Sequence, residues 1–410
     1  MALLPPAPLD TRWFFGPTEG WSLEPVARWL CADGGRMLQP VAFVEALVAR
    51  LLEAGAPIDR LRIASRTLHP QLVSTGVAWQ RGRPAESWTG EHGVEHTPAY
   101  VGSPMDHVYQ HRTPLRRRLD AALDPGEHMV LHELQAEGLR DYIALPLHDA
   151  PESIDILTLA TADARGFSDA DLERFAALVR WIRPCYELIS ARDTTVGLLN
   201  TYVGRRVGER ILRGQVRRGD GERIEAAFWY SDLRRFTELS EALPTDEVLL
   251  LLNEYFEQCA AAAAPRGGEI LQFVGDAILM VFEIPAPEAA AQVCTAALDA
   301  GLEAFARVAD INRRREAEGR PPIRFGLGLH RGTVVHANVG APDRLSFNVV
   351  GPAVNMTARI QETTKQTGVP LLVSAEFASL VVHPLRSIGR HELRGIAKTV
   401  ELYAVDTLPS

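Results

Sequence analysis

Cysteine is scarce in this chain of 410 residues: only Cys31, Cys185, Cys259 and Cys294 are present, and no two of them form a CxxC motif. A fold held together by disulfides and a zinc site built on paired cysteines are therefore excluded. Single cysteines with apolar neighbours are typical of buried, reduced thiols. Such usage favours a cytoplasmic location, where thiols stay reduced.

Long apolar runs are absent as well. No stretch approaches the roughly 20 apolar residues that a membrane-spanning helix requires. The first residues, MALLPPAPLDTRW, contain neither a basic segment nor an extended apolar segment. We therefore expect no signal peptide and no membrane insertion.

An excess of positive charge is also lacking. Lys and Arg together number 43 against 52 Asp and Glu, which gives a net charge of -9. A general nucleic-acid binder is excluded, because it would need a large basic face to neutralise phosphates. With 46% hydrophobic and 23% charged residues the chain should bury proper cores, and its length suits two or three domains.

Residues 1–190 mix short apolar runs with helical patterns, which indicates an α/β domain. One helix should begin at Ser168 or Asp169, either of which can cap it, and should continue past Leu188 although Pro184 can kink it. The expected strands are Leu61–Thr67, Val73–Gln80, Tyr142–His148 and Ile154–Ala160.

Residues 191–222 are expected to form a short helical connector between two domains. Its arginines have two interpretations that stay open, a solvated helix face or a site for a partner. They are Arg205, Arg206, Arg210, Arg213, Arg217 and Arg218.

Residues 223–405 show the order β-α-β-β-α-β. This order predicts an α+β domain with a ferredoxin-like antiparallel sheet and helices on one face. Gly275-Asp276, between two apolar runs, is a tight hairpin turn. The expected helices cover about 245–264 and 288–317, and the expected strands are Ile224–Ser231, Glu269–Val274, Ala277–Phe282 and a pair made of Ile323–His330 and Val334–Asn338.

Two aspartates stand at strand ends in this third part. Asp232 ends the first strand and Asp276 stands at the hairpin tip. If that strand lies beside the hairpin, the two carboxylates converge, and oxygen ligands of this kind suit two Mg²⁺ or Mn²⁺ ions. Taken alone, each aspartate also has a plain interpretation, because Asp232 can cap the following turn and Asp276 can be a turn residue.

A second polar group follows in Val350-Gly-Pro-Ala-Val-Asn-Met-Thr-Ala-Arg359. Pro352 suits the first turn of a helix, so that Asn355 and Arg359, four residues apart, share one face. Such a pair can hydrogen-bond an oxyanion and neutralise phosphoryl charge. A solvated helix face is the alternative.

Taken together, three segments resemble the catalytic domain of the class III adenylate and guanylate cyclase family in order and spacing. The resemblance covers about 180 residues and implies an enzyme that converts ATP to cyclic AMP and pyrophosphate with two divalent metal ions. The segments are Ala227-Phe-Trp-Tyr-Ser-Asp-Leu-Arg-Arg-Phe-Thr, Gly267-Gly-Glu-Ile-Leu-Gln-Phe-Val-Gly-Asp-Ala and Asn348-Val-Val-Gly-Pro-Ala-Val-Asn-Met-Thr-Ala-Arg.

The resemblance also implies residue roles. Asp232 and Asp276 match the metal-binding aspartates, Asn355 the residue that orients the ribose, and Arg359 the residue that stabilises the transition state at the α-phosphate. Sites of this family form between two chains, so a homodimer with two equivalent sites is implied. The residues expected at the triphosphate are Arg394, its rival Lys398, and the backbone amides around Phe236 and Thr237.

The positions that read the base depart from the family pattern. Adenylate cyclases use a lysine and an aspartate or threonine there, whereas this chain has Gln272 and Asn348. An amide can present either a donor or an acceptor, so it can satisfy adenine or guanine. We expect ATP to be preferred with some use of GTP; a guanylate or dual-specificity cyclase is the alternative.

The region before the connector resembles the C-terminal half of a GAF domain. The resemblance rests on Gly138-Leu-Arg-Asp-Tyr-Ile-Ala-Leu-Pro-Leu, Ile154-Asp-Ile-Leu-Thr-Leu-Ala-Thr and Gly166-Phe-Ser-Asp-Ala-Asp-Leu. It implies a sensor module for residues 1–190 that can hold a small ligand and regulate cyclisation through the connector.

Two rival functions remain for residues 223–405. A pseudo-cyclase, a nucleotide-binding module without turnover, is suggested by Gln272 and Asn348. Against it, all four catalytic and metal-binding candidates are present. A diguanylate cyclase would need a Gly-Gly-Asp/Glu-Glu-Phe loop, and Val274-Gly-Asp-Ala does not supply one.

Overall fold

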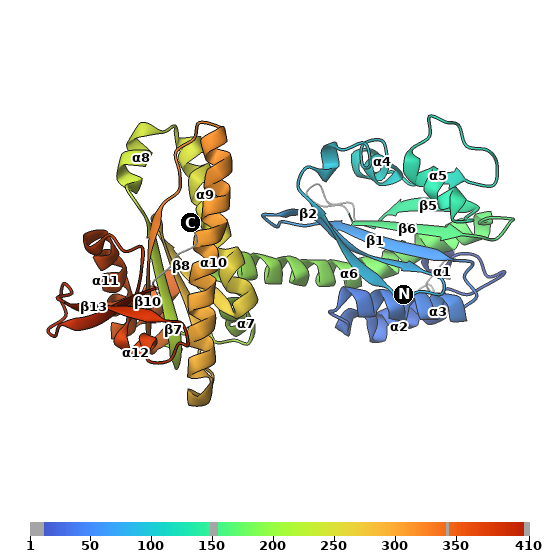
Figure 1. The fold of residues 1–410 in the computed structure, drawn as a ribbon. Helices are drawn as coiled ribbons and strands as arrows, with labels where there is room; N and C mark the ends of the chain where they lie inside the picture. Colours follow the sequence, from blue (N-terminus) through green and yellow to red (C-terminus); the bar gives the residue numbers. More distant parts are fainter. Residues whose placement is uncertain (1–11, 148–154, 342–343, 406–410) are drawn as a thin grey trace. The chain divides into compact units, whose positions relative to one another are not determined.

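The computed structural model describes residues 12–147, 155–341 and 344–405. The chain divides into two compact units, residues 1–201 and 202–410. Figure 1 shows the elements of both units. No helix among the described residues is both long and apolar enough to span a bilayer.

The first unit is built on a six-stranded sheet with the order β3-β2-β1-β6-β5-β4. Two of its cores lie on opposite faces: α2, α3 and α6 pack on one face, and α4 and α5 on the other (Figure 1). The strands are β1 (Arg60–Arg66), β2 (Leu72–Gln80), β3 (Glu86–Glu91), β4 (Leu115–Arg118), β5 (Asp141–Pro146) and β6 (Asp155–Thr161). The helices are α1 (Arg12–Phe15), α2 (Glu24–Ala32), α3 (Pro40–Glu53), α4 (Pro104–His111), α5 (Met129–Ala136) and α6 (Asp169–Val203), with short 3-10 turns η1 (Gly34–Arg36) and η2 (Val94–His96).

The α/β description expected for this unit is wrong. Every described strand pair in the sheet is antiparallel, because short connections join β1 to β2 and β5 to β6 as hairpins instead of through crossover helices. The four expected strands are present as β1, β2, β5 and β6, while β3 and β4 were not expected. His148 and Ile154, expected strand ends, lie outside the described residues.

Helix α6 begins where the sequence predicts. The Ser168 hydroxyl accepts a hydrogen bond from the Asp171 amide (3.2 Å), and the Asp171 carboxylate accepts one from the Ser168 amide (2.9 Å). This reciprocal arrangement is a capping box. The helix continues through Pro184 to Val203.

The second unit contains a seven-strand path, β13-β14-β12-β10-β7-β9-β8, with β11 paired to β10. Its strands are β7 (Gly221–Leu233), β8 (Gly268–Val274), β9 (Ala277–Glu283), β10 (Phe325–Ala341), β11 (Arg344–Val350), β12 (Leu371–Ser374), β13 (Leu385–His391) and β14 (Val400–Val405). Its helices are α7 (Arg205–Leu212), α8 (Phe236–Ala242), α9 (Thr245–Ala263), α10 (Ala290–Ala317), α11 (Pro352–Thr367) and α12 (Ala375–Ala378), with 3-10 turns η3 (Ala264–Arg266) and η4 (Pro287–Ala289).

The predicted β-α-β-β-α-β order is present as β7-α9-β8-β9-α10-β10. These four strands lie in the order β10-β7-β9-β8 and pair antiparallel, which is the ferredoxin-like arrangement, so the α+β class is confirmed. Helices α9 and α10 lie side by side over one face (Figure 1), whereas α11 packs on the other, so the helices are not confined to one face as expected. This two-sided cover explains why β7 is apolar at successive positions from Ala226 to Trp229.

The strand pair expected for Ile323–His330 and Val334–Asn338 is wrong. Apart from Ile323 and Arg324, both segments belong to one strand, β10, which pairs with β11. Gly332 in its middle has no positive φ and makes no turn. A side chain there would meet Ala353 Cβ at 2.6 Å, so this glycine lets α11 pack closely on an extended strand.

Two connector arginines are held in ion pairs within the second unit. Arg206 binds Glu283 and, at 3.0 Å, Glu222; Arg210 binds Glu222 at 3.1 Å. Arg210 is only 7% exposed and lies 4.7 Å from the Phe347 ring centroid. The solvated-face interpretation is therefore wrong for these two residues, because both anchor α7 to the sheet.

Candidate active site

A cleft of about 1000 Å³ opens at the end of β7 in the second unit. β7 and β9 pair with Asp232 opposite Ala277, which places Asp276, the preceding residue, beside the end of β7. Both aspartates line the cleft. The structure thus brings together the two carboxylates that the sequence predicts at this end of the sheet.

Local structure fixes both aspartates. Val274 pairs with Ala277 across a two-residue turn, and Gly275, first in that turn, has a φ of 62°, which glycine tolerates without strain. Next to Asp232, the buried Ser231 hydroxyl is held by the Tyr255 hydroxyl at 2.7 Å and by the Trp229 indole at 2.9 Å. The end of β7 is therefore anchored from inside the core.

The two carboxylates differ in their charge compensation. Lys365 on α11 places its Nζ 2.6 Å from Asp232 Oδ2. Partial burial, together with the neighbouring Asp232 carboxylate, raises the pKa of Asp276 to about 7. At the two aspartates themselves, two carboxylates thus face one lysine, and a further cation bound between them would relieve their repulsion.

Positive side chains form another part of the cleft lining: Arg234, Arg235, Arg324 and Lys365. Arg234 donates to Thr364 Oγ1 (2.5 Å) through Nη2, while its buried Nη1 has no partner among the described residues. Burial lowers the pKa of Arg234. A buried donor without an acceptor, beside a cleft, suits a polyanionic ligand.

The sequence interpretation missed Arg234, Arg324 and Lys365. Arg234 lies two residues beyond Asp232 and Arg324 just before β10, so both stood next to elements that the sequence did identify. Lys365 had no local signal, because its partner Asp232 is 133 residues away.

The donor set fits divalent metal ions. Asp232 and Asp276 supply carboxylate oxygens, the ligands that Mg²⁺ and Mn²⁺ prefer, and the raised pKa of Asp276 reflects charge that such an ion would offset. No group of three or more His, Cys, Asp or Glu side chains within the described residues forms a fuller ligand set. Remaining ligands would then come from the substrate and water, as is usual for Mg²⁺.

Asn355 and Arg359 do not line this cleft. They lie on α11, where Asn355 is exposed and Arg359 pairs with Glu362 at 2.7 Å. Lys365, on the same helix, does reach the cleft. Six residues separate Arg359 from Lys365, which turns their side chains about 120° apart around the helix axis.

The other predicted residues are dispersed. Phe236 and Thr237, at the start of α8, line the cleft. Gln272 is exposed on the edge strand β8, whereas Asn348 lies on β11, and the described residues show no hydrogen bond between the two amides. Arg394 and Lys398 are exposed between β13 and β14, outside the cleft.

The comparisons with known proteins concern this second unit. A family model described as the adenylate and guanylate cyclase catalytic domain matches residues 222–407. Adenylate cyclase 1 of Rhizobium meliloti (strain 1021) is 30% identical over 191 residues, 45% of this chain and 28% of that protein. The adenylate cyclase of Anabaena cylindrica is 33% identical over 181 residues, 43% of this chain and 34% of that protein. The second unit therefore carries a class III adenylate/guanylate cyclase catalytic domain.

The match covers roughly a third of the length of these curated relatives. Among solved structures, the adenylyl cyclase CyaB of P. aeruginosa is 28% identical with a TM-score of 0.42, covering 46% of this chain and 96% of that chain. A guanylyl cyclase is 29% identical with a TM-score of 0.41, covering 47% and 95%.

Proposed function

We propose that the second unit cyclises a nucleoside triphosphate, with ATP as the preferred substrate and cyclic AMP and pyrophosphate as products. The observation that carries this proposal is the cleft in which Asp232 and Asp276 lie together with cationic side chains. Carboxylates suit divalent metal, and cations suit a triphosphate. A nucleotide cyclase needs both at one place.

The reaction joins the ribose 3′-oxygen to the α-phosphorus, breaks the bond from that phosphorus to pyrophosphate, and releases the hydroxyl proton to solvent. Ions held by Asp232 and Asp276 would lower the pKa of the attacking hydroxyl and offset phosphate charge. Arg234 and Lys365 lie where they can hold the phosphates that leave. No protein base is needed to accept the proton.

Asn355 and Arg359 act, in this proposal, from a second copy of the chain. Neither lines the cleft of its own chain. Exposed apolar side chains offer a surface for such a partner, each between 39% and 55% exposed. They are Phe273 and Val274 beside the hairpin turn, and Val335, Val339, Leu345 and Val350 on β10 and β11. We therefore propose a homodimer in which Asn355 orients the ribose and Arg359 stabilises the charge that develops at the α-phosphate.

Turnover of the full-length protein tests the proposal. With Mn²⁺ and either ATP or GTP, we expect cyclic nucleotide to form, faster from ATP. Product formed faster from GTP would establish the alternative, a guanylate cyclase. No product from either nucleotide, with nucleotide binding retained, would leave a pseudo-cyclase, the alternative that the neutral amides Gln272 and Asn348 suggest.

Base preference should depend on the two amides. Replacing Gln272→Lys together with Asn348→Asp installs a fixed donor and a fixed acceptor for adenine. We expect the ATP/GTP ratio of kcat/KM to rise by about tenfold or more, since a hydrogen bond to a charged group contributes about 1.5–3 kcal/mol. The measurement is kcat/KM for each nucleotide.

A matched control carries the same charge changes elsewhere. Gln292 on α10 and Asn253 on α9 are both exposed, so Gln292→Lys with Asn253→Asp should leave the ratio unchanged. If the Gln272 and Asn348 double variant keeps the parental ratio, these residues do not read the base.

We also propose that residues 1–190 form a GAF-like module that regulates cyclisation through the connector. Helix α6 ends at Val203, and after Gly204 comes α7, whose Arg206 and Arg210 bind acidic residues at the base of the catalytic sheet. Removal of residues 1–190 should change specific activity several-fold. Cyclase assays and light scattering on the full chain and on residues 191–410 check this, and unchanged activity with unchanged dimerisation would refute it.

A further inference from the structure

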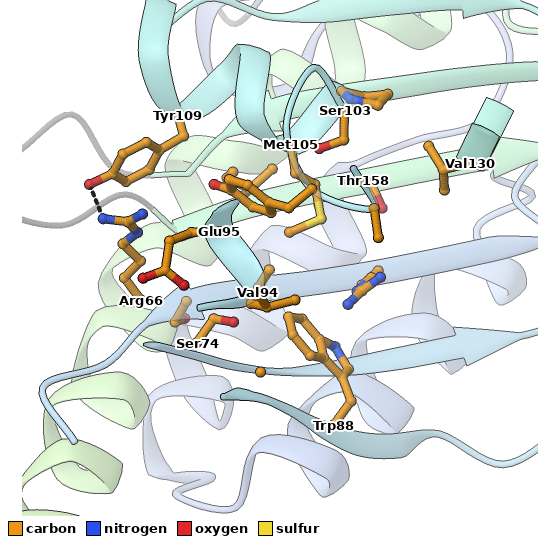
Figure 2. A pocket seen from close by; sticks show the side chains of 18 of the residues that line it. Arg66, Ser74, Trp88, Val94, Glu95, Ser103, Met105, Tyr109, Val130 and Thr158 are labelled. Carbon is orange, nitrogen blue, oxygen red and sulfur yellow. Dashed lines mark hydrogen bonds between the residues drawn. The ribbon is translucent and has the colours of Figure 1, made fainter. Parts of the chain in front are cut away.

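The first unit contains a cavity of about 330 Å³ on the face of its sheet that α4 and α5 cover (Figure 2). Strands β1, β2, β3, β5 and β6 form its floor, and η2, α4 and α5 contribute to its walls. This volume is at the lower end of the range of about 300–1,000 Å³ that small-molecule pockets usually have. None of the residues proposed for the cyclase reaction lines this cavity.

The floor of the cavity is unusual because an interior strand turns arginines toward it. Successive side chains of β1 alternate between the faces of the sheet: Leu61 and Ile63 join the core under α2 and α3, while Arg60, Arg62 and Arg66 line the cavity. Arg60 is balanced by Glu137 at 2.7 Å. Within the part of the chain that the structure describes, Arg62 and Arg66 have no ion pair.

Arg62 and Trp88 each hold an unused donor at this cavity. The Arg62 guanidinium carbon lies 3.8 Å from the centroid of the Trp88 ring. Arg62 Nε and Trp88 Nε1 are both buried, and neither has a hydrogen-bond partner among the described residues. Burial lowers the pKa of Arg62 to about 10. Leaving two such donors unpaired costs folding free energy, which a ligand that accepts from them would recover.

A glycine on the neighbouring strand makes room for the Trp88 side chain. Gly76 on β2 pairs with Trp88 on β3, and a side chain at Gly76 would meet Trp88 Cζ2 at 2.7 Å. The missing side chain lets the indole lie across β2 toward Arg62 on β1. Arg62 and the stacked Trp88 ring thus line the cavity together.

Arg66 forms a second cationic group in the cavity. It donates to the Tyr109 hydroxyl at 2.5 Å, and its guanidinium carbon lies 3.8 Å from the Tyr109 ring centroid. Figure 2 shows this pair on one side of the cavity and Trp88 on another. Glu95 also lines the cavity and accepts from the Gly93 amide at 2.8 Å. One carboxylate thus faces two unpaired arginines, and the cavity keeps a net positive charge.

The remaining walls are mostly apolar, and they include Val94, Met105, Val130, Leu134 and Ile156. We propose that this cavity binds a small organic anion with a planar apolar body, whose carboxylate or phosphate group accepts hydrogen bonds from Arg62 and is drawn toward Arg66. The Trp88 ring and the apolar wall hold the body. Planar stacking of Arg62 on Trp88 keeps the guanidinium edge free for a bidentate contact with such an anion.

Calorimetric titration of the full-length protein tests the proposal directly and needs no cyclase activity. The probes are phenylacetate, phenyl phosphate and the neutral phenylacetamide. We expect at least one of the two anions to bind, with an affinity at least about tenfold above that of the amide, because charge-assisted hydrogen bonds are the stronger kind. Which anion binds more tightly identifies the head group.

Variants locate the binding. Arg62→Gln with Arg66→Gln should weaken anion binding by about 10–100-fold, whereas Arg83→Gln, an exposed arginine in the β2–β3 turn, should leave it unchanged. Anions that bind no better than the amide, or bind equally well to the Arg62 and Arg66 double variant, would overturn the proposal.

Stability without ligand gives a second, independent readout. If Arg62 is kept for a ligand, Arg62→Met removes an unpaired buried cation at similar side-chain length, and the Tm of the ligand-free protein should rise by about 1–3 °C. A fall of that size would show that the stack on Trp88 is structural and would refute the ligand role.

Discussion

Asp276→Asn should abolish cyclic nucleotide formation, lowering kcat by roughly 10³-fold or more, because the substitution removes a carboxylate that would hold the divalent ion at the reacting phosphate. Asn keeps the shape of the turn that follows Gly275, so the loss would not come from a changed hairpin. The measurement is single-turnover and steady-state formation of cyclic AMP with Mn²⁺. Asp246→Asn, at an exposed position at the start of α9, is the matched control and should retain parental activity.

The same substitution should stabilise the metal-free protein. The pKa of Asp276 is raised from its ordinary value of 3.8 to about 7, so the folded state binds this proton more tightly than the unfolded state. The contribution to stability is therefore fully present below about pH 4 and is lost as the pH rises through 7. At pH 8 in EDTA, Asp276→Asn should melt about 2–4 °C higher than the parent. At pH 4 the difference should vanish.

Addition of metal should reverse the order of the two melting temperatures, so that the parent melts higher than Asp276→Asn. Mn²⁺ that binds the folded parent raises its Tm by mass action, and the Asn variant should gain much less. An Asn variant that is inactive yet gains as much from Mn²⁺ as the parent would place the metal elsewhere. A variant with parental activity would contradict the role of Asp276 altogether.

Activity and stability are thus expected to oppose each other at this site, because of the charges that surround Asp276. Lys365 compensates Asp232, but Asp276 lies partly buried beside a second carboxylate. A protein selected only for stability would not keep the Asp232 and Asp276 carboxylates side by side. The Arg62–Trp88 pair of the first unit has the same character, because its unused donors cost stability in the ligand-free state. Both places are therefore sites where a bound group would complete the structure.

The sequence predicted the parts of the fold that depend on local pattern. The β7-α9-β8-β9-α10-β10 order follows from apolar runs and caps, and the Gly275-Asp276 turn follows from glycine at a position with positive φ. The convergence of Asp232 and Asp276 required only one assumption, that β7 pairs with the hairpin, and this pairing is present. Where the placement of a residue depended on the pairing of neighbouring strands, sequence reasoning was sufficient.

The sequence was less informative where tertiary packing decides. Gly332 lies between the two segments expected as separate strands, but close packing of α11 requires glycine in one extended strand there. Lys365 looked like any lysine at a helix end, because only the folded chain brings it to Asp232. The cavity beside Arg62 is lined by five strands and two helices, which are far apart in the sequence. Arginines that alternate on one strand do not reveal by themselves that helices cover the face they share.

Two variants that are each inactive should regain activity when they are expressed together. Asp276→Asn lacks a metal-binding carboxylate, and Arg359→Ala lacks the cation proposed to act at the α-phosphate. Arg359 lies on α11, turned away from the face of the helix where Lys365 reaches the cleft, so its partner site would belong to a second chain. In a heterodimer one of the two sites would then be intact. When equal amounts are co-expressed, half of the dimers are mixed, so we expect about a quarter of parental activity from the whole mixture and about half from the isolated mixed dimer.

Co-expression with two affinity tags isolates the mixed dimer for the assay, and native mass spectrometry verifies its composition. The matched control pairs Asp232→Asn with Asp276→Asn; both changes affect the same half of the proposed site, so their mixture should stay inactive. Mixed dimers of Asp276→Asn and Arg359→Ala that form but remain inactive would mean that both residues act within one chain. Activity in the control mixture would mean that Asp232 and Asp276 serve different sites. Restoration in the first mixture alone would place each catalytic centre between two copies of the chain, with the carboxylates at the end of β7 facing the α11 helix of the partner.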